Sequence, residues 1–137
     1  MPVGKTKDAG WQIGVSITVP YRVEEVWEVL VGASGAAIWL GEGVQLSGEP
    51  GQRYCTSDRT RGEVRSYRHG DRIRLTWQPA DWDHDTTVQV ALQDRGDRTG
   101  LRFHQERMLS AAERDQQRQH WRNVAEDLRG VLAAELD

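Results

Sequence analysis

Cysteine, phenylalanine and proline are scarce in this chain: its 137 residues include one cysteine, one phenylalanine and four prolines. The single Cys55 excludes an intrachain disulfide framework and fits a reducing cytoplasm. Cys55 also lacks a second cysteine at CxxC spacing and a base nearby in the sequence. We therefore expect a reduced structural cysteine in a cytoplasmic protein.

The sequence also lacks long apolar runs and any strong excess of positive or negative charge. No segment approaches the length of a membrane span, and Met1–Lys7 lacks the apolar core of a signal peptide. The net charge is −3, with 18 lysine and arginine residues interspersed among 21 aspartate and glutamate residues. Without a basic stripe, we expect no nucleic-acid partner, and we expect no membrane association either.

Recognisable catalytic and cofactor motifs are absent. The sequence contains no G-x-S-x-G, phosphate loop, H-E-x-x-H or dinucleotide fingerprint. The loop Asp81-Trp82-Asp83-His84-Asp85 carries oxygen and imidazole groups, but neighbours on a short loop seldom converge on one ion, so a solvated acidic loop is expected. The sequence therefore predicts no catalytic residue, no metal and no cofactor, and it favours a non-enzymatic protein.

Tryptophan is the residue type in excess, with six copies against a single phenylalanine. Each indole brings a large apolar area and one N–H group that needs a hydrogen-bond partner. Several of them in a small protein favour a lined pocket or an interface, and plain core packing is the alternative.

The first third of the chain predicts one strand followed by two helices. Trp11 to Val19 alternates apolar and polar residues, the pattern of a half-buried strand, and Pro20 ends it. Val23 to Leu30 has apolar residues at helical spacing, with acidic residues in the first turn. Ala33 to Leu40 is expected to be a second short helix closed by Gly41.

From Val44 to Met108 the pattern changes to short strands joined by tight turns. Such connections predict a mostly antiparallel sheet. The expected strands are Val44–Leu46, Gln52–Ser57, Gly62–Arg68, Asp71–Gln78, Thr86–Gln93 and a last strand from Leu101 to Met108.

The segment Ser110–Asp137 predicts a long terminal helix. Ser110 and Glu113 have the spacing of a capping box. Apolar residues recur at three- and four-residue steps from Trp121 onward, whereas the first half is polar on the same face. Gly130 inside this helix is expected to mark the close approach of another backbone, because glycine costs about 1 kcal/mol there relative to alanine.

A long helix needs a large apolar partner, and the preceding strands supply one. We therefore expect an α+β fold in which a curved antiparallel sheet wraps around the terminal helix. The whole chain, residues 1–137, is expected to form a single domain, with residues 1–9 as a loose N-terminal segment.

This order of elements, together with several short motifs, resembles the helix-grip fold of the START-like, or SRPBCC, superfamily. Within it, the chain is similar to the heat-shock-protein ATPase activator homologues, and the resemblance extends from about Trp11 to Leu136. The motifs that carry it are Val26-Trp27-Glu28-Val29-Leu30, Trp39-Leu40-Gly41, Gly62-Glu63-Val64, Arg72-Ile73-Arg74-Leu75-Thr76-Trp77, Phe103-His104-Gln105-Glu106-Arg107-Met108 and His120-Trp121.

The resemblance implies a cavity between the sheet and the terminal helix that holds a hydrophobic or aromatic small molecule. Strand alternation points Ser66, Trp77 and Gln105 toward this space, together with either Tyr54 or Cys55. A few fixed polar groups in an apolar wall are what orients a small ligand.

Further residues complete the expected ligand site. Arg118 and Gln117, on the polar half of the terminal helix, are candidates to meet an acidic or carbonyl group of the ligand. The residues predicted to contact ligand are Trp39, Tyr54, Ser66, Trp77, Trp82, Gln105, Arg118 and Trp121, with Trp39 and Trp82 as gates at the mouth.

Two other classes of function stay open. One is an enzyme that resembles polyketide cyclases or hydratases, which would need several inward polar groups with shifted pKa values. The other is a co-chaperone-like interaction module, with homodimerisation and a chaperone partner both open, in which the tryptophans would form an exposed patch.

Overall fold

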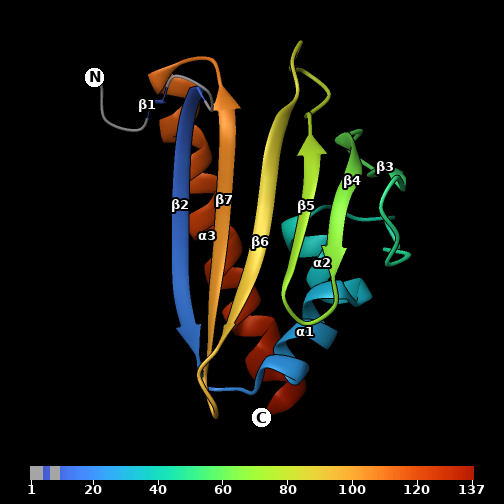
Figure 1. The fold of residues 1–137 in the computed structure, drawn as a ribbon, viewed down its shortest axis with the longest axis vertical. Coiled ribbons are helices and arrows are strands. Elements are labelled where there is room, and N and C mark those ends of the chain that lie inside the picture. The colour runs from blue at the N-terminus through green and yellow to red at the C-terminus, as the bar shows by residue number, and fades with distance from the viewer. Residues whose placement is uncertain (1–4, 7–9) are drawn as a thin grey trace.

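The computed structural model describes residues 5–6 and 10–137, and it confirms the α+β expectation. A seven-stranded antiparallel sheet with the order β1-β2-β7-β6-β5-β4-β3 lies in front of the long helix α3 in Figure 1. The elements are β1 (Lys5–Thr6), β2 (Gly10–Val19), α1 (Val23–Val31), α2 (Ala33–Trp39), β3 (Arg53–Cys55), β4 (Arg61–Arg68), β5 (Arg72–Trp77), β6 (Thr86–Asp94), β7 (Thr99–Met108) and α3 (Ala111–Leu136).

The three helices cover one face of the sheet, and the core lies between. Along β5 and β6 the inward residues are buried because one sheet face packs on the helices while the other faces water. Ile73, Leu75, Val88 and Val90 have no accessible surface. The helix-grip arrangement predicted from the sequence is therefore present.

One expectation about a single segment, the strand Val44–Leu46, was wrong. Val44–Leu46 is not a strand, because the adjacent backbone is bonded to a side chain instead of a ladder: Gln52 accepts from Ser47 N at 2.8 Å and donates to Gln45 O at 2.7 Å. Of the segment 1–9, expected to be loose, only Lys5 and Thr6 are described, and they form β1; residues 1–4 and 7–9 lie outside the described residues.

A bulge in β4 corrects the expected orientation of Ser66. Val64 lies opposite inward Leu75, but Ser66 lies opposite outward Arg74, since the register shifts between Val64 and Ser66. The extra residue turns every later side chain to the other face of the sheet. Tyr67, rather than Ser66, therefore faces the core, and its ring meets the edge of Trp27 at 5.6 Å.

The helix α3 begins as predicted and differs along its length as predicted. Ser110 Oγ accepts from Glu113 N at 3.1 Å, and Glu113 Oε1 accepts from Leu109 N at 3.2 Å. The second half of the helix supplies most of its buried apolar surface. Those residues are Trp121, Val124, Ala125, Leu128 and Leu132.

The expectation for Gly130 was wrong. Among residues 5–6 and 10–137, no other backbone approaches it, and a Cβ built at Gly130 would meet no atom of a neighbouring element within 4 Å. Gly130 is exposed, so it adds flexibility to the unfolded chain and lowers helix propensity with no compensating contact.

Gly130→Ala should therefore raise the free energy of unfolding by about 0.5–1 kcal/mol, measured by urea denaturation. Gly62→Ala is the matched control, because its Cβ would lie 1.9 Å from Thr76 O and must destabilise the sheet. A loss of stability in Gly130→Ala would contradict the exposed position of this glycine.

Leu128→Ala should lower the free energy of unfolding by about 2–5 kcal/mol, because it removes a fully buried side chain between α3 and the sheet. Leu128 is 1% exposed, whereas Leu109 is 65% exposed and serves as the control site. Equal effects of Leu128→Ala and Leu109→Ala in the same denaturation experiment would contradict the proposed core.

Candidate functional site

A chain of buried hydrogen bonds joins the polar half of α3 to three strands of the sheet. Gln105 on β7 has no accessible surface, and its Oε1 accepts from Gln117 Nε2 at 3.0 Å and Trp121 Nε1 at 2.8 Å. Gln105 Nε2 donates to Thr86 Oγ1 at 2.9 Å, and that hydroxyl donates to Trp77 O at 2.7 Å. The buried amide is thus satisfied by partners on β6 and α3.

Aromatic rings surround this network. Trp121 stacks on Phe103 with ring centroids 5.0 Å apart, and its edge meets His120 at 4.8 Å. Trp77 lies 5.7 Å from His120 and 5.6 Å from Trp82. The rings form a continuous aromatic layer from β7 through α3 to the loop after β5. We call this set the aromatic layer: Trp77, Trp82, Phe103, His120 and Trp121.

Two buried nitrogens of the aromatic layer have no hydrogen-bond partner among the described residues: Trp77 Nε1 and His120 Nε2. Burial lowers the pKa of His120, so its imidazole is neutral at pH 7. An unpaired buried polar group costs about 1–3 kcal/mol, so a place where two occur together is a place where a ligand group or water can be accommodated favourably.

The loop 79–85 covers the aromatic layer and is fastened to the start of α3. His84 Nε2 lies 2.8 Å from Glu113 Oε1 and its Nδ1 lies 3.0 Å from Asp83 Oδ1. Trp82 stacks on the His84 ring at 5.0 Å, and Gln78 Nε2 donates to Trp82 O at 2.7 Å. Because Glu113 also belongs to the helix cap, one carboxylate holds both the loop and the helix end.

The pKa of His84 reflects these contacts. Burial acts to lower it, but the hydrogen bonds to Glu113 and Asp83 and the charges of both carboxylates outweigh burial and raise the pKa above its usual value. The expectation of an acidic loop fully in solvent therefore misses its two ring residues, which are partly buried. Among the described residues no three or more histidine, cysteine, aspartate or glutamate side chains could hold a metal ion.

Four of the eight predicted ligand-contacting residues come together. Trp77, Gln105 and Trp121 meet in the network, and Trp82 closes it from the loop. The sequence reasoning did not single out Thr86, His84 or Glu113 as site residues, and it considered His120 only as part of a family motif.

The other four predicted residues lie elsewhere. Tyr54 is buried on β3 with its hydroxyl donating to Thr76 O, while Cys55 is exposed, and burial raises the pKa of Tyr54. Trp39 cannot gate a pocket, because it is 2% exposed and its Nε1 donates to Leu30 O at 2.9 Å. Ser66 faces outward at the bulge.

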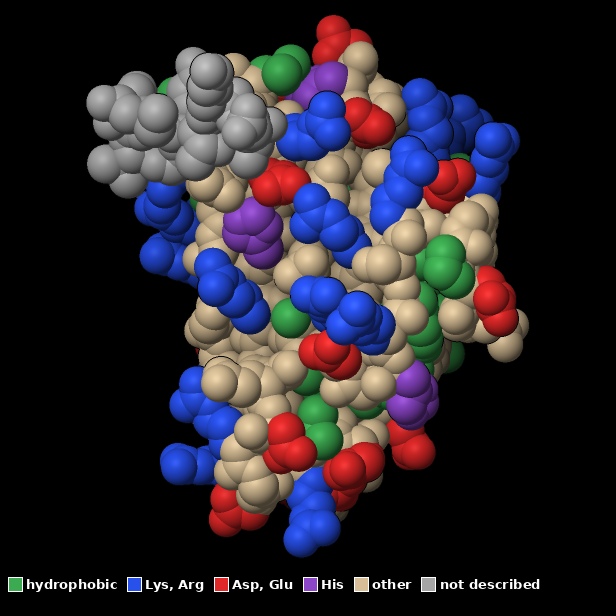
Figure 2. Space-filling view, viewed as in Figure 1, with side chains coloured by type: hydrophobic (Ala, Val, Ile, Leu, Met, Phe, Trp, Pro, Cys, Tyr) green, Lys and Arg blue, Asp and Glu red, His purple; other side chains and the backbone are tan. Residues whose placement is uncertain are grey.

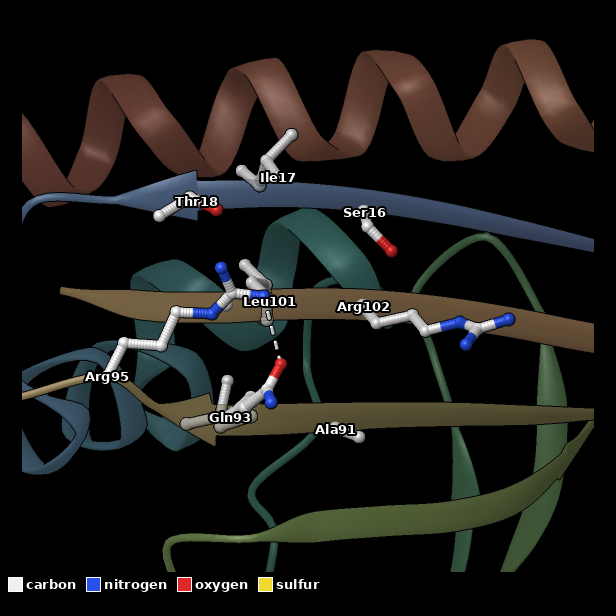
Figure 3. A pocket seen from close by; sticks show the side chains of 10 residues that line it. Ser16, Ile17, Thr18, Ala91, Gln93, Arg95, Leu101 and Arg102 are labelled. Carbon is white, nitrogen blue, oxygen red and sulfur yellow. Dashed lines mark hydrogen bonds between the residues drawn. The ribbon is translucent and has the colours of Figure 1, made fainter.

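Arg118 lies in a groove between α3 and β2, away from the aromatic layer. This groove, of about 460 Å³, is one of several surface hollows. Two more, of about 330 Å³ and 390 Å³, lie on the outer face of the sheet and share Arg102. Figure 3 shows the first, where Arg95 reaches toward Leu101 and donates to Gln93 Oε1 at 3.0 Å, and Figure 2 shows lysine and arginine side chains across this outer face.

The fourth hollow lies beside β3 and includes Tyr54. None of these four hollows is lined by Trp77, Gln105 or Trp121. The predicted cavity between the sheet and α3 therefore stays a prediction.

Comparison with known proteins identifies the family. A family model described as "Activator of Hsp90 ATPase homolog 1-like protein" matches residues 20–133, which is most of the chain. The chain belongs to this activator-like family. The match confirms the resemblance inferred from the sequence motifs, and it begins just after β2. Among curated protein sequences, none matches the chain.

Solved structures similar to this activator-like protein show its fold. DynU16, a protein in the dynemicin biosynthetic locus, is 20% identical with a TM-score of 0.79; the match covers 89% of this chain and 47% of DynU16. The chain thus spans about half the length of DynU16. CalU16 from Micromonospora echinospora is 18% identical with a TM-score of 0.78, covering 97% of this chain and 82% of CalU16. MLL2253 from Mesorhizobium loti is also 18% identical, with a TM-score of 0.77, covering 92% and 98%.

The contact between His84 and Glu113 makes the stability of this activator-like protein depend on pH. A raised pKa means that the folded state binds the proton more tightly, so this stabilisation is complete below about pH 6.5 and is lost as pH rises through the folded-state value. The difference in unfolding free energy between wild type and His84→Gln should therefore be larger at pH 5.5 than at pH 8.5, measured in urea.

His104→Gln is the control with the opposite sign. Burial lowers the pKa of His104, which faces outward beside Gln12 at 2.9 Å, so its protonation destabilises the folded state as pH falls. The advantage of wild type over His104→Gln should shrink toward pH 5.5. Identical pH dependence of the two variants would contradict the proposed role of the His84 contact.

Proposed function

We propose that this protein binds an apolar or aromatic small molecule between the sheet and α3, at the aromatic layer. The observation that carries the proposal is the pair of buried, unpartnered nitrogens, Trp77 Nε1 and His120 Nε2, beside an amide network that is otherwise fully paired. A planar ligand with an acceptor oxygen would pair with the indole N–H while its ring stacks on neighbouring indoles.

The chemistry of the surrounding residues supports an uncharged or weakly polar ligand. Trp77 and Trp121 are nearly or fully buried, and His120 is neutral at pH 7 because burial lowers its pKa. A full charge placed here would be desolvated without a counter-ion, which is strongly unfavourable. Gln105 has its acceptor oxygen occupied twice, so it supports the ring positions instead of offering a free group.

Ligand entry requires the loop 79–85 to move. Trp82 covers Trp77 edge-on, and His84 fastens the loop to Glu113. Opening the loop breaks the charge-assisted contact of His84 with Glu113, the edge contact of Trp82 with Trp77 and the hydrogen bond from Gln78 to Trp82 O. No strand of the sheet is disturbed. In this proposal Trp82 lies at the mouth of the ligand site.

The family description also suggests a co-chaperone-like interaction module. Aromatic anchors of such an interface would have to be exposed. Trp27, Trp39, Trp77 and Trp121 are buried, and the one exposed large hydrophobic residue of the described chain is Leu109. This distribution favours ligand binding over an interface anchored by tryptophan.

Tryptophan-fluorescence titration with planar phenols, aromatic ketones and fatty acids tests the proposal. We expect a saturable change in emission with at least one planar ligand, and Trp77→Phe should weaken its binding by about tenfold, since an indole N–H hydrogen bond to the ligand is lost. Trp39→Phe is the matched control, because Trp39 packs in α2 with its own backbone partner.

Native mass spectrometry of protein purified from its own host provides a second measurement. A co-purifying small molecule that is absent from the Trp77→Phe protein would support the proposal. The proposal fails if no ligand of the panel changes the emission and the purified protein carries no bound molecule. A mass change of an added ligand would instead indicate an enzyme, with neutral His120 as the base to test first.

A further inference from the structure

The outer edge of β2 is the most open backbone edge of the sheet. Figure 1 shows β2 near the border of the sheet, with α3 starting beside it and slanting behind β7 and β6 toward the C-terminus. Among the described residues, β1 pairs only with Gly10 and Trp11, so the edge from Ile13 to Val19 has no strand beside it. An unpaired edge of this length is a template for another extended chain.

Two arginines of α3 identify which backbone groups face outward. Arg114 Nε donates to Gln12 O at 2.9 Å, and Arg129 Nη1 donates to Thr18 O at 3.3 Å. Backbone groups of alternate residues in a strand point to the same side. The N–H and C=O groups of Gly14 and Ser16, which lie between the two bonded carbonyls, therefore also face the open edge.

The arginine contacts also align the helix with the strand. From Gln12 to Thr18 the strand rises by about 20 Å, and from Arg114 to Arg129 the helix rises by about 22 Å. The two elements thus run in the same general direction, and the arginine contacts mark where they meet at each end. Interpolation between these two contacts places Arg118 near Gly14 and Arg122 near Val15, and both arginines line one groove with Gly14 and Ser16.

Arg118 and Arg122 have no fixed partner. Within the described part of the chain, neither forms a hydrogen bond or ion pair, in contrast to Arg114, which contacts Asp115 at 3.5 Å, and Arg129, which contacts Glu126 at 3.6 Å. Both free arginines line the groove of about 460 Å³ beside β2. The groove is lined by Gly14, Val15, Ser16, Ile17, Arg118, Arg122, Ala125 and Glu126.

We propose that this groove binds an extended acidic peptide, which adds a strand to the edge of β2 and places two alternate carboxylates on Arg118 and Arg122. The spacing fits, because helical residues four apart are separated by about 6 Å along the axis, and alternate residues of a strand by about 6.7 Å. Backbone hydrogen bonds to Gly14 and Ser16 give the pairing, and the two arginines select acidic side chains.

Charge also distinguishes this partner from a second copy of the chain. An antiparallel pairing of two β2 edges would bring the Arg118 and Arg122 side chains of both copies together, and like charges at such short range repel. A chain with carboxylates at alternate positions meets no such repulsion.

The test uses a labelled octapeptide of alternating valine and glutamate, and the same peptide with lysine in place of glutamate. Fluorescence anisotropy should show binding of the glutamate peptide alone. In the double variant Arg118→Glu with Arg122→Glu, binding should weaken by about tenfold or more, because two charge-assisted contacts become repulsive. Arg68→Glu, on the distant strand β4, should leave the affinity unchanged.

A second variant tests the backbone contact. Ser16→Pro removes one outward N–H group and leaves the ladder to β7 intact, as proline is tolerated on an edge whose N–H faces solvent. Ser16→Pro should weaken binding of the glutamate peptide. In the wild type, adding this peptide should shift the amide NMR signals of Gly14 and Ser16. The proposal is overturned if the glutamate peptide does not bind at about 1 mM, binds the arginine double variant equally well, or is excluded by a dimer through the β2 edge.

Discussion

The side-chain amide of Gln105 determines how the terminal helix lies on the sheet. Its oxygen accepts from Trp121 and Gln117 of α3, and its nitrogen donates to Thr86 of β6. Sliding α3 by one turn, or slipping β7 by one residue, would leave this buried amide unpaired. Apolar packing between helix and sheet tolerates many arrangements, but this network tolerates one. The positions of Trp77, Trp121 and the loop above them follow from it.

The fold could be predicted from the sequence wherever a segment has one buried face and one solvent-exposed face. The alternation from Trp11 to Val19 and the apolar stripe after Trp121 result directly from such half-burial, and both elements lie where they were expected. Alternation also placed Trp77 and Gln105 on the inner face of their strands. Periodicity thus located the sheet, the terminal helix and the centre of the candidate site.

Features that depend on contacts between distant residues could not be predicted in this way. The bulge that turns Ser66 outward is one extra residue in β4, with no signal in composition. The side chain of Gln52 takes the bonds that a Val44–Leu46 strand would have made, and His84 finds Glu113 29 positions along the chain. Each of these features depends on one contact between residues that only the folded chain brings together.

The strand β2 and the helix α3 lie far apart in the sequence but pack together, and this affects how the protein folds during translation. β2 pairs with β7 and packs against α3, and Tyr21 donates to Asp137 across 116 positions. Contacts this far apart in sequence slow folding, because a long loop must close before they form. While the ribosome is still adding α3, the part of the apolar sheet face that α3 covers in the folded protein is exposed. The nascent chain therefore has to avoid aggregation until α3 has been made and can pack on the sheet.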